Sequence, residues 1–324
     1  MSTRFDVAAF GELVIDMIPV ENKEGALLFA AKPGGAPGNV AAGVAHLGLR
    51  AAMLTKVGPG LLGSLLIETL AQAGVDTHGI VRSAIDPTAL AVVSVNAHGE
   101  PEFMLYRNGC ADSRYEPADL ALDVVQACRV LHVGSLLLAY PLSGQAQRLA
   151  VQTARSAGAL ISTDVNFRPA LWSDIDAMYA TGREAIASAD IVKVSAEELL
   201  GLTSTTDTKT AVRMLWHSRL KVFAVTHGSA GAELFTPHCH VTVAGFPVKV
   251  IDTVGCGDAF TAALLMGLLQ NDISALDENK LYRISLTACA AGAAVARVTG
   301  AMQHMPRPND IADLIAGSTG YSNI

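Results

Sequence analysis

The residue types that phosphoryl transfer requires lie together in one short segment, Asp252–Phe260, with the sequence D-T-V-G-C-G-D-A-F. Gly255 and Gly257 permit a tight turn and leave backbone N–H groups uncovered at the start of the apolar run 259–269, which predicts a helix. Uncovered N–H groups and the positive end of a helix dipole favour an anion such as a phosphate. Asp258 places a carboxylate beside this anion site, where it is suited to accept a proton from an attacking hydroxyl. A carboxylate that only caps the helix is the structural alternative.

Two neighbours of this turn carry separate predictions. The run 248–251 is rich in valine and isoleucine, which favours the end of a strand. Cys256 lies inside the turn, and because a helix N-terminus lowers the pKa of a thiol, we expect a reactive, oxidisable cysteine. A small buried cysteine without special reactivity is the alternative.

Strand-like and helix-like segments alternate along the second half of the chain. The predicted strands are 130–133, 160–164, 191–194 and 222–226. Helices are predicted between them, for example at 143–157 and 177–189. This alternation is typical of a parallel sheet with helices on both faces, in which ligands bind at the carboxyl ends of the strands. Polar clusters follow three of these strands, at 164–168, 193–198 and 226–231.

The first half of the chain adds a strand at 5–10 and an extended segment at 13–19, then a turn-rich stretch before a small-residue helix at 40–48. Asp16 is a lone carboxylate inside an apolar run, so it requires a partner or a ligand unless it faces solvent. Asn39 either caps the small-residue helix or points its amide at a ligand that approaches the preceding glycines.

A β-hairpin is predicted from the strands 89–95 and 102–107 and the turn 98–100. A hairpin in this position indicates a small sheet that stands off the main body as a lid. Its apolar residues predict a face for a homodimer; they are Val92, Val93, Phe103 and Leu105.

Composition excludes several classes of partner. Of 324 residues, 16% are charged, and the net charge of -7 includes no basic run, which argues against nucleic-acid and acidic-membrane binding. Five scattered cysteines without a C-x-x-C pair indicate neither a disulfide framework nor a zinc finger. No signal peptide and no apolar run of membrane-spanning length is recognisable, so we expect a cytoplasmic protein.

Several motifs occur in a fixed order over nearly the whole chain: G-E-L-V-I-D at 11–16, P-G-G-A-P-G-N at 33–39, S-A-E-E at 195–198, T-H-G-S-A-G at 226–231 and D-T-V-G-C-G-D-A-F at 252–260. This set resembles the ribokinase-like (PfkB) family of carbohydrate kinases, and within it the fructokinases. The resemblance implies one ribokinase-like three-layer α/β/α domain over residues 1–324, with a mainly parallel central sheet. It also implies a small β-sheet lid built from insertions at about 12–33 and 89–110.

The same resemblance implies transfer of the γ-phosphoryl group of ATP to a sugar hydroxyl, with fructose as the favoured sugar. Asp258 would be the base, and the N–H groups of Gly255, Cys256 and Gly257 would form the anion hole. The implied sugar-binding residues are Asp16, Gly34, Gly35, Asn39, Arg107, Asn166 and Arg168. The implied ATP-binding residues are Lys193, Ser195, Thr226, Gly228, Gly231 and Cys289.

Two cation sites follow from the resemblance. Glu198 would help to hold Mg²⁺ through water, and Ser195 stands where many members have Asn. A monovalent cation, K⁺ in particular, would lie at Asp252 with backbone carbonyl groups near Val254, Val295 and Gly300. A turn Asp that only bonds its own backbone is the alternative for Asp252.

Departures and alternatives limit these expectations. The stretch 57–63, V-G-P-G-L-L-G, lacks the acidic residue that the family usually carries there, so the following helix has no acidic cap. Arg107 and Arg168 could each bind a carboxylate or a phosphate, which keeps the acidic sugar 2-keto-3-deoxygluconate as an alternative acceptor. Ribose is a further alternative. A non-catalytic sugar-binding regulator would have lost Asp258. A nicotinamide-dependent dehydrogenase would need a G-x-G-x-x-G turn after the first strand, and none is present.

Overall fold

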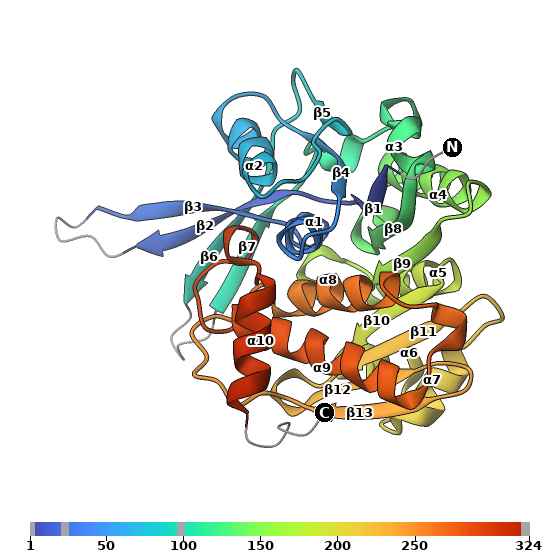
Figure 1. Ribbon diagram of the computed structural model, residues 1–324. Coiled ribbons are helices and arrows are strands. Elements are labelled where there is room, and N and C mark those ends of the chain that lie inside the picture. The colour runs from blue at the N-terminus through green and yellow to red at the C-terminus, as the bar shows by residue number, and fades with distance from the viewer. Residues whose placement is uncertain (1–3, 21–25, 96–100, 319–324) are drawn as a thin grey trace.

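The computed structural model describes residues 4–20, 26–95 and 101–318. Most strands lie in one sheet of nine (Figure 1), and its strand order runs as follows: β13 (His240–Ala244), β12 (Gly231–Phe235), β11 (Val222–Thr226), β10 (Ile191–Ser195), β9 (Leu160–Asp164), β8 (Cys128–Gly134), β1 (Phe5–Phe10), β4 (Ala51–Val57) and β5 (Ile80–Arg82). Pairing is parallel from β11 to β5 and antiparallel in β11–β12–β13. The predicted mainly parallel sheet is therefore confirmed.

Helices cover both faces of this sheet. One layer contains α1 (Ala36–His46), α2 (Leu61–Gln72), α8 (Cys256–Leu269), α9 (Glu278–Val295) and α10 (Pro308–Gly317). The other contains α3 (Leu122–Gln126), α4 (Pro141–Ser156), α5 (Ile175–Ala187), α6 (Ala196–Thr203) and α7 (Thr208–Leu215). The predicted three-layer α/β/α architecture is confirmed.

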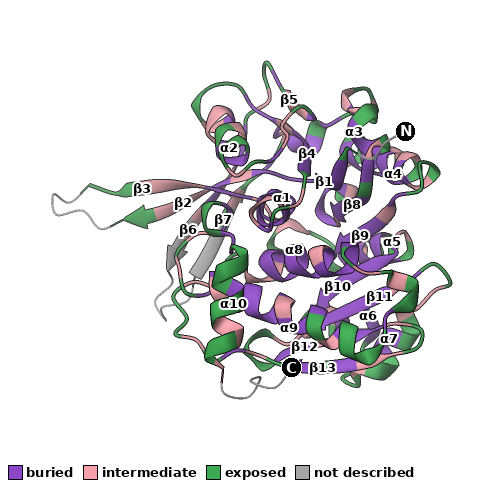
Figure 2. Ribbon diagram, viewed as in Figure 1, coloured by how far each residue is buried: buried purple, intermediate pink, exposed green. Residues whose placement is uncertain are grey.

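Each central strand contributes side chains to two separate hydrophobic cores, because successive side chains of a strand point to opposite faces of the sheet. On β1, Val7 and Ala9 belong to the core with α1 and α8, whereas Ala8 and Phe10 belong to the core with α4. This double burial explains why the strands are continuous apolar runs rather than alternating ones. Figure 2 shows the buried strands between two layers whose exposed residues face outward.

A second sheet of four strands projects from the main body (Figure 1), in the order β3 (Leu28–Gly34), β2 (Val14–Val20), β6 (Ala89–Val95) and β7 (Pro101–Tyr106). Two antiparallel hairpins, β2–β3 and β6–β7, join through the parallel pair β2–β6. The small separate sheet predicted from the sequence is thus present. The turn predicted at 98–100 and the side chains of Val93 and Phe103 lie outside the described residues.

The strand predicted at 248–251 is wrong. Residues 245–250 form no strand or helix, and Ile251 N–H instead donates to the carbonyl oxygen of Ala296 at the end of α9, over 2.7 Å. Val250 and Ile251 are 55% and 60% exposed. Their β-branched side chains favour an extended backbone, but the chain here has left the sheet edge to reach α8.

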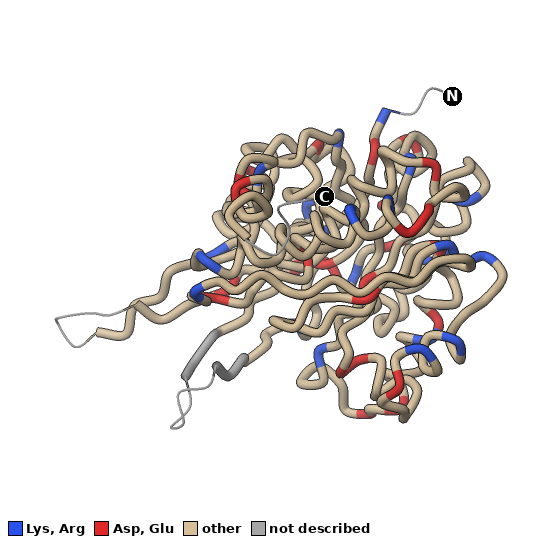
Figure 3. Tube along the Cα trace, turned by 60° about the horizontal axis from the view of Figure 1, so that its bottom comes forward, with Lys and Arg blue, Asp and Glu red and all other residues tan. Residues whose placement is uncertain are grey.

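The surface agrees with the diffuse charge of the sequence. Acidic and basic residues are interspersed in the view of Figure 3. Within the described part of the chain, no helix has the length and hydrophobicity needed to cross a bilayer.

Helices α1 and α8 pack closely because small residues face each other, and these helices carry Asn39 and Asp258. A Cβ added at Gly43 would lie only 2.8 Å from the Cβ of Ala262. We expect Gly43→Val to lower the free energy of unfolding by about 1–3 kcal/mol through overpacking, as measured by urea denaturation. Gly317→Val is the matched control, since nothing lies within 4 Å of that position. Equal losses in both variants would contradict close packing at Gly43.

Candidate active site

A cavity of about 740 Å³ lies where the small sheet meets the carboxyl ends of the central strands and the N-terminus of α8. Its size is that of a small-molecule site. Among the residues predicted for a site, those lining it are Asp16, Gly35, Asn39, Arg107, Asn166, Arg168, Lys193, Ser195, Glu198, Val254, Gly255, Gly257 and Asp258. The predicted residues outside its lining are Gly34, Cys256, Thr226, Gly228, Gly231, Cys289, Asp252, Val295 and Gly300.

Asp258 lies in the first turn of α8, which begins after Gly255 adopts a left-handed conformation with φ 84°. The carboxyl group is buried, with the residue 8% exposed, and its Oδ2 accepts a hydrogen bond from Asn39 Nδ2 at 2.7 Å. Burial raises the pKa of Asp258 to about 6, against the hydrogen bond from Asn39, which lowers it. A buried carboxylate that titrates near neutrality is suited to accept a proton.

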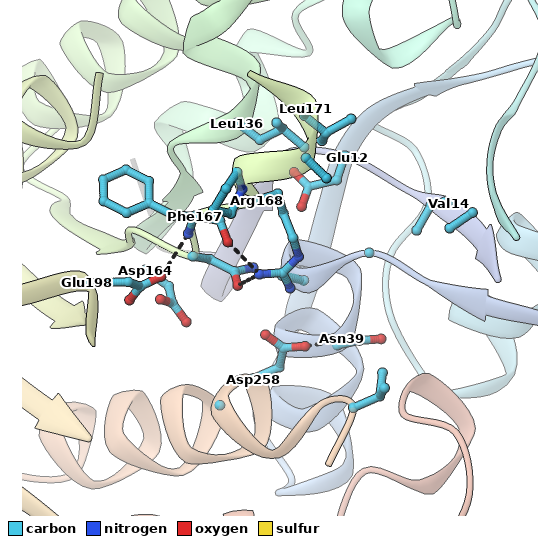
Figure 4. A pocket seen from close by; sticks show the side chains of 18 of the residues that line it. Glu12, Val14, Asn39, Leu136, Asp164, Phe167, Arg168, Leu171, Glu198 and Asp258 are labelled. Atoms are coloured by element: carbon cyan, nitrogen blue, oxygen red, sulfur yellow. Dashed lines mark hydrogen bonds between the residues drawn. The ribbon is translucent and has the colours of Figure 1, made fainter. Parts of the chain in front are cut away.

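Asn39 is not a helix cap, which corrects one of its two predicted roles. Helix α1 begins at Ala36, and Gly35 is its N-cap with φ 107°. Asn39 therefore lies in the first turn of α1, where its amide reaches Asp258 (Figure 4). Its Oδ1 is buried without a hydrogen-bond partner. A ligand hydroxyl would supply the missing donor.

Asp16 reaches the cavity from β2, and Gly34 on the paired strand β3 makes room for it. A Cβ at Gly34 would lie 2.5 Å from Asp16 Oδ2. Burial raises the pKa of Asp16 to about 6, while Arg168 lowers it. Gly34 thus acts on the site through Asp16 rather than by lining the cavity.

The turn before α8 brings two of its three predicted donors to the cavity. Gly255 and Gly257 line it, whereas Cys256 N–H turns back to the carbonyl oxygen of Thr253 at 3.3 Å. A Cβ at Gly257 would lie 3.0 Å from Lys193 Nζ, so the glycine lets this ammonium group approach the turn.

Lys193 forms a buried ion pair at the base of the cavity. Its Nζ lies 3.0 and 3.2 Å from the two carboxylate oxygens of Asp164, and the two side chains are 8% and 3% exposed. The pair is formed without a ligand, so it places a positive group beside the α8 N-terminus at little cost in reorganisation.

The prediction of a lowered pKa for Cys256 is wrong. Burial, with Asp252 and Asp258 next, raises the pKa of the thiol to about 11. Because a raised pKa leaves little thiolate at neutral pH, Cys256 fits the alternative of a small, unreactive residue.

Glu198 is held by backbone donors at the start of α6. Its Oε2 accepts from Ser195 N–H and its Oε1 from Phe167 N–H, both at 2.7 Å, and Ser195 Oγ accepts from Glu198 N–H at 3.1 Å. Ser195 and Glu198 therefore form a capping box at the start of α6. Each Glu198 oxygen retains a lone pair, and oxygen is the donor that Mg²⁺ prefers. Within the described residues no cluster of three acidic, histidine or cysteine ligands is preformed.

The two arginines differ in how they are engaged. Arg107 is buried, and its Nη2 pairs with Asp112 Oδ2 at 2.6 Å, while its Nε has no partner. Arg168 Nη1 donates to Asn166 Oδ1 at 2.6 Å and to the Phe167 carbonyl oxygen at 3.0 Å, which are neutral acceptors. Figure 4 shows the Arg168 side chain in the same space as Glu12 and Asp258. Asn166, at φ 46°, adopts the left-handed conformation that turns this segment toward the cavity.

Asp252 ties the turn before α8 to the segment after α9. Its Oδ1 accepts from Val254 N–H and its Oδ2 from Gly300 N–H, both at 3.0 Å. The carbonyl oxygen of Val295 accepts from Val298 N–H at 3.1 Å. Asp252 thus contacts both Val254 and Gly300, and the cation predicted at this point stays a prediction.

The predicted nucleotide residues form a separate group. Thr226 ends β11, Gly228 has φ 58°, and Gly231 has φ 112° where a Cβ would lie 2.0 Å from the Val243 carbonyl oxygen. Cys289 is buried in the core formed by α9. Their contact with ATP stays a prediction.

Three site residues were not assigned roles from the sequence. Glu12 and Asp164 line the cavity and stood inside predicted motifs. Glu12 lies two residues after the end of β1, and Asp164 is the last residue of β9. Their position near the carboxyl ends of predicted strands could have identified them as site residues from the sequence. Asp112, the partner of Arg107, has no local signal.

Comparisons with known proteins agree over almost the whole chain. The family described as pfkB family carbohydrate kinase matches residues 4–308. The chain is 38% identical over 318 residues to Fructokinase-2 of Solanum habrochaites, which covers 96% of each chain. Its structure is similar to that of a fructokinase with bound ATP from Xylella fastidiosa, with a TM-score of 0.89 and 30% identity over 96% of this chain and 98% of that one. A fructokinase from Vibrio cholerae O395 in fructose, ADP and calcium ion bound form gives a TM-score of 0.83 and 28% identity over 96% and 99%.

The raised pKa of Cys256 predicts resistance to alkylation. At pH 8 a thiol with a pKa of about 11 is ionised to roughly one part in a thousand. We expect iodoacetamide at pH 8 to leave Cys256 unmodified in the folded protein and to modify it after unfolding, as followed by peptide mass spectrometry. Rapid modification of the folded protein at this position would restore the reactive-thiol hypothesis.

Proposed function

Because the chain belongs to the pfkB family of carbohydrate kinases, we propose that it is an ATP-dependent fructokinase, which transfers the γ-phosphoryl group of ATP to a hydroxyl of fructose. The observation that carries the proposal is the position of Asp258. This buried carboxylate lines the same cavity as Asp16 and Asn39, whose side chains are suited to bind sugar hydroxyl groups. The ammonium group of Lys193, which approaches the N-terminus of α8, lies in the same cavity. Base, acceptor site and phosphoryl site therefore share one cavity.

In the proposed reaction, the hydroxyl of the sugar lies against Asp258 and attacks the γ-phosphorus. An O–P bond to the sugar forms, the bond between the γ-phosphorus and the bridging oxygen breaks, and ADP leaves with that electron pair. The proton of the hydroxyl passes to Asp258. The N–H groups of Gly255 and Gly257, together with Lys193, stabilise the negative charge on the transferring group.

Mg²⁺ bound with ATP would supply further positive charge beside the phosphates, and Glu198 would hold it through water. Glu198 lines the cavity with both oxygens oriented by backbone N–H groups. This arrangement keeps the carboxylate in place before any ligand arrives. The nucleotide itself is proposed to contact Ser195, Thr226, Gly228, Gly231 and Cys289.

A neutral acceptor fits the sugar end better than an acidic one. Arg107, which could hold the carboxylate of 2-keto-3-deoxygluconate, is already neutralised by Asp112 at 2.6 Å. Within the lining that the structure describes, Arg168 is the arginine engaged by neutral acceptors alone. Its guanidinium lies near Asp258, where the γ-phosphoryl group would arrive, and the acid remains the alternative substrate.

Three finer features belong to the same proposal. A monovalent cation such as K⁺ would bind near Asp252 and stiffen the turn before α8. It would act on the same turn as the hydrogen bonds that Asp252 accepts from the N–H groups of Val254 and Gly300. The chain would form a homodimer through the small sheet. Leu105, predicted for the dimer face, lines the cavity instead, and its neighbours Met104 and Tyr106 are 53% and 58% exposed. It would act in the cytoplasm.

Removal of the base tests the reaction. We expect Asp258→Asn to lower kcat with fructose by about 10²–10⁴-fold while the dissociation constant for fructose changes little. ADP release, measured with fructose, ribose and 2-keto-3-deoxygluconate, gives both the rate and the acceptor. Asp313→Asn, at an exposed position on α10, is the matched control. Normal turnover by Asp258→Asn would refute the assignment of the base, and turnover of 2-keto-3-deoxygluconate alone would replace fructose.

The pH dependence tests the environment of the base. Asp258 must be ionised to accept a proton, so with its pKa at about 6 we expect kcat to fall about tenfold per pH unit below that value. Asn39 lowers this pKa through its hydrogen bond, so Asn39→Ala should move the fall to higher pH. An unchanged midpoint in Asn39→Ala would show that another group controls the acidic limb.

A further inference from the structure

Three unsatisfied polar atoms converge on the sugar end of the cavity. Buried side-chain atoms without a hydrogen-bond partner number six among the described residues, and three of them belong to cavity-lining residues: Glu12 Oε2, Asn39 Oδ1 and Arg107 Nε. Buried polar atoms are ordinarily satisfied, so three orphans around one space indicate a ligand that satisfies them. The two oxygens require donors and the nitrogen requires an acceptor, which is the pattern of a polyhydroxylated molecule.

Glu12 is the member of this group that has no assigned role. It lies two residues after β1, at the carboxyl end of a central strand, and it is 8% exposed. Figure 4 shows its side chain directed into the cavity opposite Asp258. No salt bridge to Glu12 is found in the described residues, because Arg107 pairs with Asp112 instead.

A role in the stability of the fold does not explain why a carboxyl group is buried at Glu12. A buried carboxylate kept for the fold is normally paired with a cation or saturated by donors. Here burial raises the pKa of Glu12 to about 7. Arg107 and the backbone N–H of Glu12 itself oppose this rise, Asp112 adds to it and Arg168 opposes it weakly, and Oε2 still has no partner. An ionised Glu12 therefore destabilises the folded protein above that pH, which is common for a group retained for binding.

We propose that Glu12 is a further sugar-binding residue, whose Oε2 accepts a hydrogen bond from a substrate hydroxyl and which selects uncharged sugars against sugar acids. The proposal deepens the proposed function and rests on its assignment of the cavity to a sugar. The acceptor chemistry is that of a neutral ketose or aldose, with hydroxyl groups placed to meet Glu12 and Asn39 and a ring or hydroxyl oxygen placed to meet Arg107.

Selection against sugar acids follows from the local charge. Three carboxyl groups line this end of the cavity, those of Glu12, Asp16 and Asp258. Two guanidinium groups oppose them, and that of Arg107 is already paired with Asp112 behind the lining. A carboxylate on the substrate would add to this excess and would leave the acceptor atom of Glu12 without a donor. The carboxylate of Glu12 is thus a repulsive element as well as a hydrogen-bond acceptor.

The test compares Glu12→Gln with the wild-type chain in binding and in turnover. Fructose and 2-keto-3-deoxygluconate are titrated calorimetrically at pH 8 without ATP, so that binding is measured apart from catalysis. We expect Glu12→Gln to bind fructose about tenfold more weakly, because a charge-assisted hydrogen bond is replaced by a neutral one, and to lose part of its preference for fructose over the acid. Glu68→Gln, an exposed position on α2, is the matched control.

Thermal stability separates a binding role from a structural one. The folded-state pKa of Glu12 lies above its unfolded value, so the ionised carboxyl costs stability at pH 8, and Glu12→Gln removes this cost. We expect its melting temperature at pH 8 to rise by several degrees while fructose affinity falls. A fall in melting temperature with unchanged sugar affinity would overturn the proposal.

Glu12→Asp separates charge from reach. This variant keeps the negative charge but shortens the side chain by one methylene group. Fructose binding should therefore weaken, while the preference for fructose over 2-keto-3-deoxygluconate persists. An unchanged preference in Glu12→Gln would also overturn the selective role. If the wild-type chain binds fructose but phosphorylates no sugar, the proposed function fails while these binding results still decide the role of Glu12.

Discussion

Asn39 and Asp258, 219 positions apart in the sequence, are joined by a buried hydrogen bond of 2.7 Å that connects helices α1 and α8. This contact is possible because small residues such as Gly43 and Ala262 let the two helices approach each other. Burial raises the pKa of Asp258, and the bond from Asn39 both limits that rise and fixes the direction of the carboxyl group. The site is thereby oriented by core packing rather than by loops, which is the more rigid solution.

The remainder of the cavity follows the same pattern of groups held in place before a ligand binds. Lys193 is held by Asp164, Arg107 by Asp112, and Glu198 by two backbone N–H groups. Each partner is itself fixed to a strand, a helix or a segment next to one. A transition state whose charge appears quickly is stabilised best by dipoles and charges that need not move.

Local patterns in the sequence were sufficient for most of the fold. Apolar runs marked the strands of the parallel sheet, and polar clusters after them marked the edge where the cavity lies, because both signals are carried by neighbouring residues. The segment 248–251 misled because β-branched residues favour an extended backbone whether or not a strand lies beside it. Whether such a segment has a strand to pair with depends on the tertiary structure, which the local sequence does not show.

The electrostatic features of the site were less accessible from the sequence. The helix dipole alone predicted a reactive Cys256, but burial, Asp252 and Asp258 raise its pKa. Both carboxylates stand in the motif, whereas the burial of the thiol and its closeness to them depend on the folded structure. Glu12 and the Arg107–Asp112 pair depend likewise on which distant segments meet. Residue types at strand ends identify where a site lies, whereas the charge state of each member depends on how completely water is excluded.

The excess of carboxyl groups at the sugar end also bears on the end of a catalytic cycle. In a kinase that acts on a neutral sugar, the acceptor enters without charge and leaves as a phosphate ester that carries almost two negative charges at neutral pH. Glu12, Asp16 and Asp258 line the cavity throughout, so they face an uncharged molecule before the reaction and an anion after it. At the sugar end these carboxyl groups oppose the negative charge of the product, whereas Lys193 and the turn before α8 attract its phosphoryl group, so the two ends of one cavity act on the product in opposite directions.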